Sequence, residues 1–215
     1  MPSHRIEPRY ALAHQWYASY LNAMGRLEEA QAELRRAREL DPLSLMLNMS
    51  AADPYFFGRE YRRAIKHLLA TLEHDQRFFP AIFNLGRAYV QEKMYEEAIA
   101  ALERAVRLSG NREGLPALAH AYALAGREDD ARKILKQLRE KGAGRYVASP
   151  LIARIHLGLG EIDAAFEWLR KGLDERSYWN VFLKMDPVYD PIRPDPRFAE
   201  MLKRIGLLQQ SRSAA

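Results

Sequence analysis

The chain has 215 residues, of which 48% are hydrophobic and 28% are charged, so it can bury a core and does not have the composition of a disordered protein. It contains no cysteine, which excludes disulfides, thiol catalysis and cysteine-based metal sites, and its 12 glycines and 11 prolines are too few for a collagen or an elastic linker. The excess of 33 Lys and Arg over 28 Asp and Glu gives a net charge of +5, which is mild compared with dedicated nucleic-acid binders.

The N-terminal residues show no export or membrane signal. Residues 1–10 are polar and charged, without the apolar core of a signal peptide. The longest stretch free of Asp, Glu, Lys and Arg runs for 16 residues from Tyr10 to Gly25, and it is too short and too polar to span a bilayer. We therefore expect a soluble, cytoplasmic chain with no membrane partner.

Further along, pairs of an alanine followed four residues later by a leucine recur at a nearly constant spacing. These pairs are Ala30/Leu34, Ala64/Leu68, Ala98/Leu102, Ala131/Leu135 and Ala165/Leu169, with spacings of 34, 34, 33 and 34 residues. Twelve residues before each alanine stands a small residue, and a larger one follows it three residues later: Ala18/Leu21, Ala52/Tyr55, Gly86/Tyr89, Ala119/Tyr122 and Ala153/His156. Such periodicity indicates five repeats, at about 9–42, 43–76, 77–110, 111–143 and 144–175.

Each half-repeat has the spacing of an amphipathic helix, as in Leu27, Ala30, Leu34 and Ala37. A turn signal such as Met24-Gly25-Arg26 separates the two halves. One helix pair has two apolar sides, so neighbouring pairs must stack into an all-α solenoid. Acid–base pairs such as Glu33/Arg36 are expected to be solvated.

These residues resemble the tetratricopeptide repeat family over most of the chain, about residues 9–175. The third unit matches its pattern best, with Leu85, Gly86, Tyr89, Ala98 and Leu102, although Ile82 replaces the family's tryptophan. The resemblance implies a right-handed superhelix of helix-turn-helix repeats, in which the first helix of each pair lines a concave groove that holds a peptide.

Projecting the sequence onto that groove gives twelve candidate binding residues. They are Gln15, Ser19, Asn22, Met46, Met49, Asp53, Phe56, Phe83, Arg87, Val90, His120 and Arg154. Members of the family that bind chaperone tails hold a terminal carboxylate with a clamp of lysine, asparagine and arginine. Gln15, Ser19 and Asp53 occupy the corresponding places here, so that clamp is not reproduced.

Aromatic residues gather in the second and third units. The chain has 3 Trp, 11 Tyr and 8 Phe, and seven of these fall between residues 55 and 83: Tyr55, Phe56, Phe57, Tyr61, Phe78, Phe79 and Phe83. Two interpretations remain open. Phe56 and Phe83 could face the groove with Met46 and Met49, or most of these rings could fill the core around a disturbed helix.

Pro54 is the cause of that disturbance. A proline inside the first helix of the second unit removes one backbone hydrogen bond and clashes with the carbonyl of Ser50. The sequence therefore predicts a break or kink near Asp53-Pro54 that widens the groove.

Both ends depart from the repeat pattern. Ile6-Glu7-Pro8 stands 34 residues before Leu40-Asp41-Pro42, so residues 1–8 are interpreted as the tail of a truncated repeat, and the chain as a fragment or shortened relative of a longer protein. Residues 176–215 begin with prolines at 187, 191, 194 and 196, which exclude a regular helix there. Asp195-Pro196 then predicts a short capping helix through Ile205, ended by Gly206 and followed by a flexible tail. This ending resembles those of tetratricopeptide regions in bacterial signalling proteins.

No catalytic, cofactor or metal motif is present. The six histidines have no metal-ligand spacing, and no phosphate loop or nucleophile elbow occurs. We therefore expect no enzyme activity and no cofactor. The leading hypothesis is a protein-interaction module that binds a protein or peptide in its groove, as part of a larger bacterial regulatory protein.

Two alternatives stay open. Repeat faces left uncovered at the N-terminus could make the chain a self-associating scaffold. Residues 127–145 hold seven basic residues against four acidic ones and could contact phosphates, but Tyr146 is the only aromatic nearby, so nucleic-acid binding is the weaker alternative.

Overall fold

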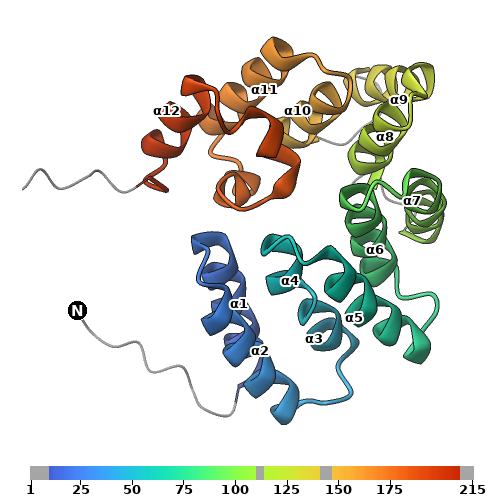
Figure 1. Ribbon diagram of the computed structural model, residues 1–215, viewed down its shortest axis with the longest axis vertical. Coiled ribbons are helices and arrows are strands. Elements are labelled where there is room, and N and C mark those ends of the chain that lie inside the picture. The colour runs from blue at the N-terminus through green and yellow to red at the C-terminus, as the bar shows by residue number, and fades with distance from the viewer. Residues whose placement is uncertain (1–9, 110–113, 141–146, 209–215) are drawn as a thin grey trace, which may run out of the picture. The chain divides into compact units, whose positions relative to one another are not determined.

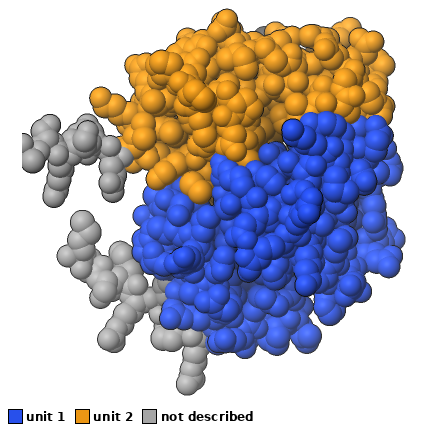
Figure 2. Space-filling model, in the orientation of Figure 1, with its two compact units in different colours: residues 1–109 blue, residues 110–215 orange. Residues whose placement is uncertain are grey.

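The computed structural model describes residues 10–109, 114–140 and 147–208, and every regular element in these ranges is helical (Figure 1). The interpretation of residues 1–8 as a repeat tail lies outside the described residues, as does the expected flexible tail beyond residue 208. The chain divides into two compact units, Met1–Ser109 and Gly110–Ala215 (Figure 2).

Unit 1 is built from helix pairs. Its elements are α1 (Ala11–Met24), α2 (Leu27–Leu40), α3 (Leu45–Ser50), α4 (Asp53–Phe57), α5 (Tyr61–His74), α6 (Phe79–Gln91) and α7 (Tyr95–Ser109). Helix α1 packs on α2, α3 and α4 pack on α5, and α6 packs on α7. The pairs stack in turn, because α2 also contacts α3 and α4, and α5 also contacts α6.

Unit 2 continues the pattern and then leaves it. Its elements are α8 (Leu115–Leu124), α9 (Glu128–Arg139), α10 (Ser149–Gly158), α11 (Ile162–Asp174), the 3-10 helices η2 (Tyr178–Phe182) and η3 (Pro187–Ile192), and α12 (Pro196–Arg204). Helix α8 packs on α9 and α10, α10 packs on α11, and α12 packs on α11.

The recurring alanines of the sequence are the points of closest packing between paired helices. All five alanines that begin the Ala-x-x-x-Leu motif are fully buried, and the five leucines are buried as well. Gly86 shows why the opposing position must be small, since a Cβ there would lie 2.6 Å from Cγ of Leu102. The repeat signal therefore records helix–helix approach rather than a binding function.

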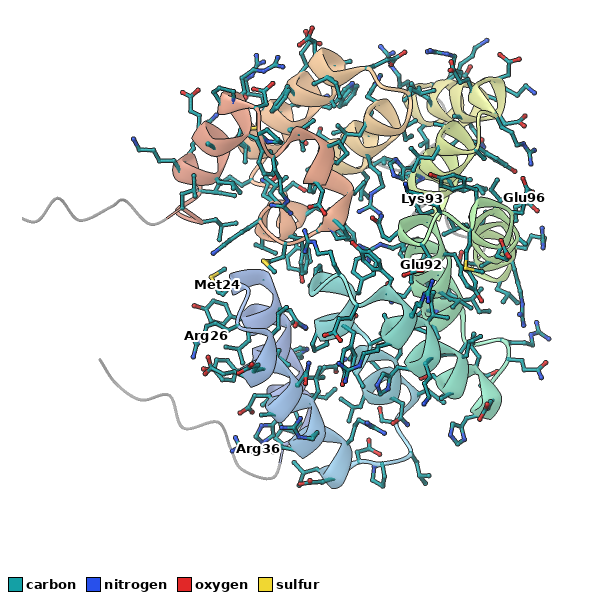
Figure 3. All side chains as sticks on the ribbon, in the orientation of Figure 1. Met24, Arg26, Arg36, Glu92, Lys93 and Glu96 are labelled. Carbon is teal, nitrogen blue, oxygen red and sulfur yellow. The ribbon has the colours of Figure 1, made fainter. Side chains whose placement is uncertain are left out.

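All five turns inside the helix pairs share one backbone geometry. Gly25, Arg59, Lys93, Gly126 and Gly160 each have a positive φ, between 61° and 80°. In each turn the amide of this residue donates to the carbonyl three residues back, and the next amide donates to the carbonyl five residues back. A residue in the left-handed region thus ends the first helix, and the two amides bond to carbonyls that would otherwise have no hydrogen-bond donor. Figure 3 shows Lys93 at the turn between α6 and α7.

The predicted break at Pro54 is confirmed. Helix α3 ends at Ser50, the amide of Ala52 donates to the carbonyl of Met49 only three residues back, and α4 begins at Asp53. Pro54 then stands in the first turn of α4, where backbone N–H groups have no partner within the helix, so the missing N–H of proline costs no hydrogen bond. In the second repeat, the two short helices α3 and α4 thus take the place of a single first helix.

The C-terminal residues cover α11. The side chain of Asp195 accepts a hydrogen bond from the amide of Arg197 at the start of α12, and Gly206 follows the helix with a φ of 73°. Phe198, Met201 and Leu202 are buried against residues of α11 in one apolar cluster that η3 joins through Val188, Tyr189 and Ile192. This cluster closes the outer side of the last helix pair.

Candidate functional site

The first helices of unit 1 are tied together by side-chain hydrogen bonds. Nε2 of Gln15 on α1 donates to Oγ of Ser50 on α3 over 2.9 Å. Nδ2 of Asn84 on α6 donates to Sδ of Met49 on α3 over 3.3 Å. Because each bond joins two different helix pairs, the first helices present one continuous surface, which we call the first-helix face.

Arg87 on α6 is the cation of the first-helix face. Its guanidinium carbon lies 4.6 Å from the centre of the Phe56 ring on α4, and its Nη1 donates to Oδ1 of Asn84 over 3.2 Å. Burial raises the pKa of Asp53 to about 7, and the positive charge of Arg87 opposes this shift. A cation, an aromatic ring and a carboxyl group close to its titration point therefore meet on this face.

The predicted groove residues of unit 1 differ in exposure. Asn22, Met49, Phe56 and Val90 are buried, so they support the surface rather than form it. The others are partly or well exposed in the structure: Gln15, Ser19, Met46, Asp53, Phe83 and Arg87.

The aromatic residues of the second repeat, which lies in unit 1, pack mainly against one another. The Phe56 ring lies edge-on to Phe57 at 5.5 Å and to Tyr61 at 5.9 Å. Tyr55 instead stacks on His67 at 5.0 Å. Phe56 therefore fits the interpretation in which these rings fill the core beside the broken helix. Its ring also lies under the guanidinium of Arg87.

His120 and Arg154 lie in the interior of unit 2. Nδ1 of His120 is 2.8 Å from the carbonyl oxygen of Arg154, and Nη2 of Arg154 donates to Oδ2 of Asp186 over 3.0 Å. All three side chains are buried. The reason is tertiary: the segment between η2 and η3 brings the Asp186 carboxylate onto α10, where sequence projection placed an open groove.

The expectation that the Glu33/Arg36 pair is solvated is wrong for Glu33. It is buried, with Oε2 2.5 Å from Nδ1 of His14 and Oε1 accepting from Nη1 of Arg36 over 2.7 Å. The sequence showed only the neighbour on the same helix, Arg36, and contained no signal for the contact with His14 across the pair. Ser50 and Asn84 were missed for the same reason, since their partners lie 35 residues away.

The basic stretch at 127–145 is largely paired where the structure describes it. Arg127 and Lys133 both contact Asp130, at 2.9 and 3.0 Å, and Arg132 contacts Glu161 at 2.7 Å. These ion pairs reduce the positive field that a phosphate backbone would meet.

Neither a metal site nor a membrane span is found in the described residues. Across residues 10–109, 114–140 and 147–208, no three His, Asp or Glu side chains are grouped so that they could hold a metal ion. Every helix in the described part is too short or too polar to cross a bilayer.

Sequence comparison gives one consistent family. Three family models, each described as a tetratricopeptide repeat, match residues 11–42, 49–113 and 91–155. Among curated proteins, no sequence matches significantly.

Solved structures share the fold at low sequence identity. TTC0263, a thermophilic protein of Thermus thermophilus, is 20% identical over 90% of this chain and 99% of its own, with a TM-score of 0.62. PilF of Pseudomonas aeruginosa is 19% identical over 91% of each chain, with a TM-score of 0.57. A chain of the Cut9–Hcn1 hetero-tetramer of the APC/C is 14% identical over 94% of this chain and 40% of its own, with a TM-score of 0.62. These likenesses support the all-α repeat fold.

Proposed function

The chain belongs to the tetratricopeptide repeat family, and from this premise we propose that it is a non-catalytic protein-interaction module whose first-helix face in unit 1 binds a peptide segment of a partner protein. The observation that carries the proposal is the chain of contacts from Gln15 through Ser50, and from Met49 through Asn84 to Arg87. These contacts hold polar and charged groups of successive helices in fixed positions, which lowers the entropic cost of ordering them around a peptide.

Arg87 supplies the specificity of this face. A guanidinium held on the Phe56 ring keeps its donors in a fixed plane, which suits a peptide carboxylate or main-chain carbonyl. Asp53 on the neighbouring helix favours a peptide that also brings a donor or a positive charge. We therefore expect peptides with both an acidic and a basic side chain.

A random peptide library tests the proposal directly. Peptides of about 12 residues are selected on the full chain, and the affinity of enriched sequences is measured by fluorescence anisotropy. We expect Arg87→Glu to weaken binding at least about tenfold by replacing attraction with repulsion.

Arg104→Glu is the matched control, because Arg104 is an exposed arginine on α7 rather than on the first-helix face. Loss of binding in both variants, or in neither, contradicts the proposed site. Circular dichroism of both variants shows whether the helices are intact.

The ending of the chain supports a second proposal, that these repeats belong to a larger regulatory protein. Asp195-Pro196 and the helix through Leu202 resemble the ends of repeat regions in bacterial signalling proteins. The reading frame upstream of Met1 tests this. A continuous frame that encodes an upstream effector domain supports the proposal, and a stop codon with a ribosome-binding site and no repeat-like remnant contradicts it.

A further inference from the structure

The exposed side of α1 carries a row of large apolar side chains. Leu12, Trp16 and Tyr20 follow one another at intervals of four residues, and 41%, 65% and 53% of their surfaces are exposed. We call this row the α1 ridge. Tyr10 lies edge-on to Trp16 at 6.4 Å, and Tyr17 stacks on Tyr20 at 6.2 Å. Single exposed apolar residues are ordinary on protein surfaces, but a continuous patch of this kind marks an interaction site.

The repeat register shows that this side of a first helix is covered elsewhere. The position of Tyr20 corresponds to Pro54, Ala88, Ala121 and Ile155 in the other pairs, and all four are buried. Helix α6, which carries Ala88, packs against α5 of the preceding pair as well as against α7. The α1 ridge therefore occupies the side where a helix pair meets its predecessor.

The residues of the ridge do not suit another repeat at the usual distance. The Tyr20 position holds alanine or proline in three of the other pairs and Ile155 in the fourth. The Trp16 position holds Ser50, Asn84, Ala117 and Leu151, so neither position is aromatic in another pair. Small side chains let helix axes approach closely, whereas two aromatic rings hold them apart. Aromatic residues are instead enriched in interfaces between separate molecules.

The charge of α1 fits a copy of itself. Between Tyr10 and Gly25 there is no Asp, Glu, Lys or Arg, so two such helices can meet without repulsion between like charges. A twofold interface places the same patch on both partners, so any charge in the patch would face an equal charge.

The far end of the repeats does not offer a partner for the ridge. The outer side of α11 is closed by α12 and η3 through the cluster around Phe198 and Ile192. Head-to-tail stacking of copies, which would place the α1 ridge on the last helix pair, is therefore blocked.

We propose that the α1 ridge is the interface of a twofold homodimer, in which α1 of one copy packs against α1 of a second. This goes beyond peptide binding and uses residues other than those of the first-helix face. The exposed parts of Tyr10, Trp16 and Tyr20 amount to roughly 250–400 Å² per copy when each ring buries about 150–250 Å². Together with Leu12, both copies bury less than about 1,000 Å² in total, which is below the area of stable complexes, so the dimer is weak and forms reversibly.

Sedimentation velocity of the full chain between about 2 and 500 µM tests the dimer. We expect the weight-average mass to rise from one to two chains across this range and to stop at two. Trp16→Glu combined with Tyr20→Glu keeps the chain monomeric throughout, because the variant places four carboxylates in the interface. Both side chains are more than half exposed, so the helix itself is retained, and circular dichroism confirms this.

Leu43→Glu is the matched control, since Leu43 is an exposed leucine in the turn after α2, away from the ridge. The control variant dimerises like the parent chain. Mixing a Trp16→Glu chain with a Trp16→Lys chain restores a dimer that neither forms alone.

Several outcomes overturn the proposal. A parent chain that stays monomeric at 500 µM removes the dimer, and a dimer that survives the double glutamate variant removes the ridge as its interface. Mass that grows beyond two chains indicates head-to-tail stacking. A dimer that appears only after deletion of residues 2–9 shows that this segment of the same chain covers the ridge.

Discussion

At the scale of single residues, burial decides which charged groups act as structure and which lie at the surface. Asp186 and Arg154 form an ion pair inside unit 2, with 6% and 7% of their side chains exposed. Arg87, by contrast, is partly exposed on α6 and belongs to the proposed binding surface. Sequence spacing assigned Arg154 and Arg87 to the same groove because both stand on first helices.

Asp186→Asn tests the weight of the buried ion pair. The variant removes the negative charge that faces the guanidinium. It also leaves one acceptor oxygen where Asp186 uses two, Oδ2 for Arg154 and Oδ1 for the amide of Val188. We expect the free energy of unfolding in urea to fall by about 3 kcal/mol. Asp163→Asn, which removes the exposed pair with Arg197, changes it by less than about 1 kcal/mol. Equal effects of the two variants would contradict the role of burial.

A second residue-scale prediction concerns close packing at Gly86. Gly86→Ala places a Cβ 2.6 Å from Cγ and 2.9 Å from Cδ2 of Leu102, whose side chain is fully buried and has no room to withdraw. Overpacking costs about 1–3 kcal/mol and outweighs the gain in helix propensity of about 1 kcal/mol. Urea unfolding should therefore show a less stable variant. Loss of the effect in a Leu102→Ala background identifies Leu102 as the cause, and an additive result contradicts it.

At the scale of elements, the five helix pairs share one turn whether or not a glycine stands at its left-handed position. The turn after α1 has Gly25 at its left-handed position, and the turns after α8 and α10 have Gly126 and Gly160. The turns after α4 and α6 keep the same two hydrogen bonds although Arg59 and Lys93 occupy that position. The packing of the paired helices thus imposes the turn even where the residue is unfavourable.

Lys93→Gly is expected to stabilise the chain. A non-glycine residue in the left-handed region costs about 1–2 kcal/mol. Glycine removes this cost but loses more freedom on folding, by about 0.4–1 kcal/mol. The net gain is about 0.5 kcal/mol, seen as a higher urea midpoint. The reverse change, Gly126→Ala, should destabilise by about 0.5 kcal/mol for the same reason, and a stabilising result there would refute the argument.

At the scale of the whole molecule, the two units carry opposite responses to pH. Burial lowers the pKa of His120 to about 4, and the charge of Arg154 acts in the same direction, so unfolded unit 2 binds more protons between pH 4 and 6.5. Asp53 has its pKa raised to about 7, so folded unit 1 binds more protons between about pH 4 and 7. Acidification therefore destabilises unit 2 and stabilises unit 1.

Hydrogen exchange followed by mass spectrometry resolves the two units. Between pH 7.5 and 5, after correction for intrinsic exchange rates, we expect protection to rise in α3–α6 and to fall in α8 and α10, each by about 1–2 kcal/mol. Asp53→Asn removes the first change, and His120→Gln removes the second. A parallel response of both units in the parent chain would contradict this assignment.

What the sequence alone determined is the repeated architecture. Pro54 and the Asp195-Pro196 start are local signals, because helix breaking and capping depend on residues within a few positions of one another. Alanine spacing and the small-to-large pairs concern contacts between helices, and they are visible in the sequence because they recur with the period of the repeat. They predicted the helix pairs, the break before α4 and the capping helix α12.

Only the tertiary structure decided which side chains are covered. The His14–Glu33 contact, the carboxylate that meets Arg154, and the hydrogen bonds of Ser50 and Asn84 join residues 19 to 35 positions apart. The exposure of Tyr20 likewise follows from the absence of a described helix over α1, although the corresponding residue is buried in every other pair. Burial is a property of the neighbours that folding brings together, and a repeat pattern is the same whether or not a neighbour is present.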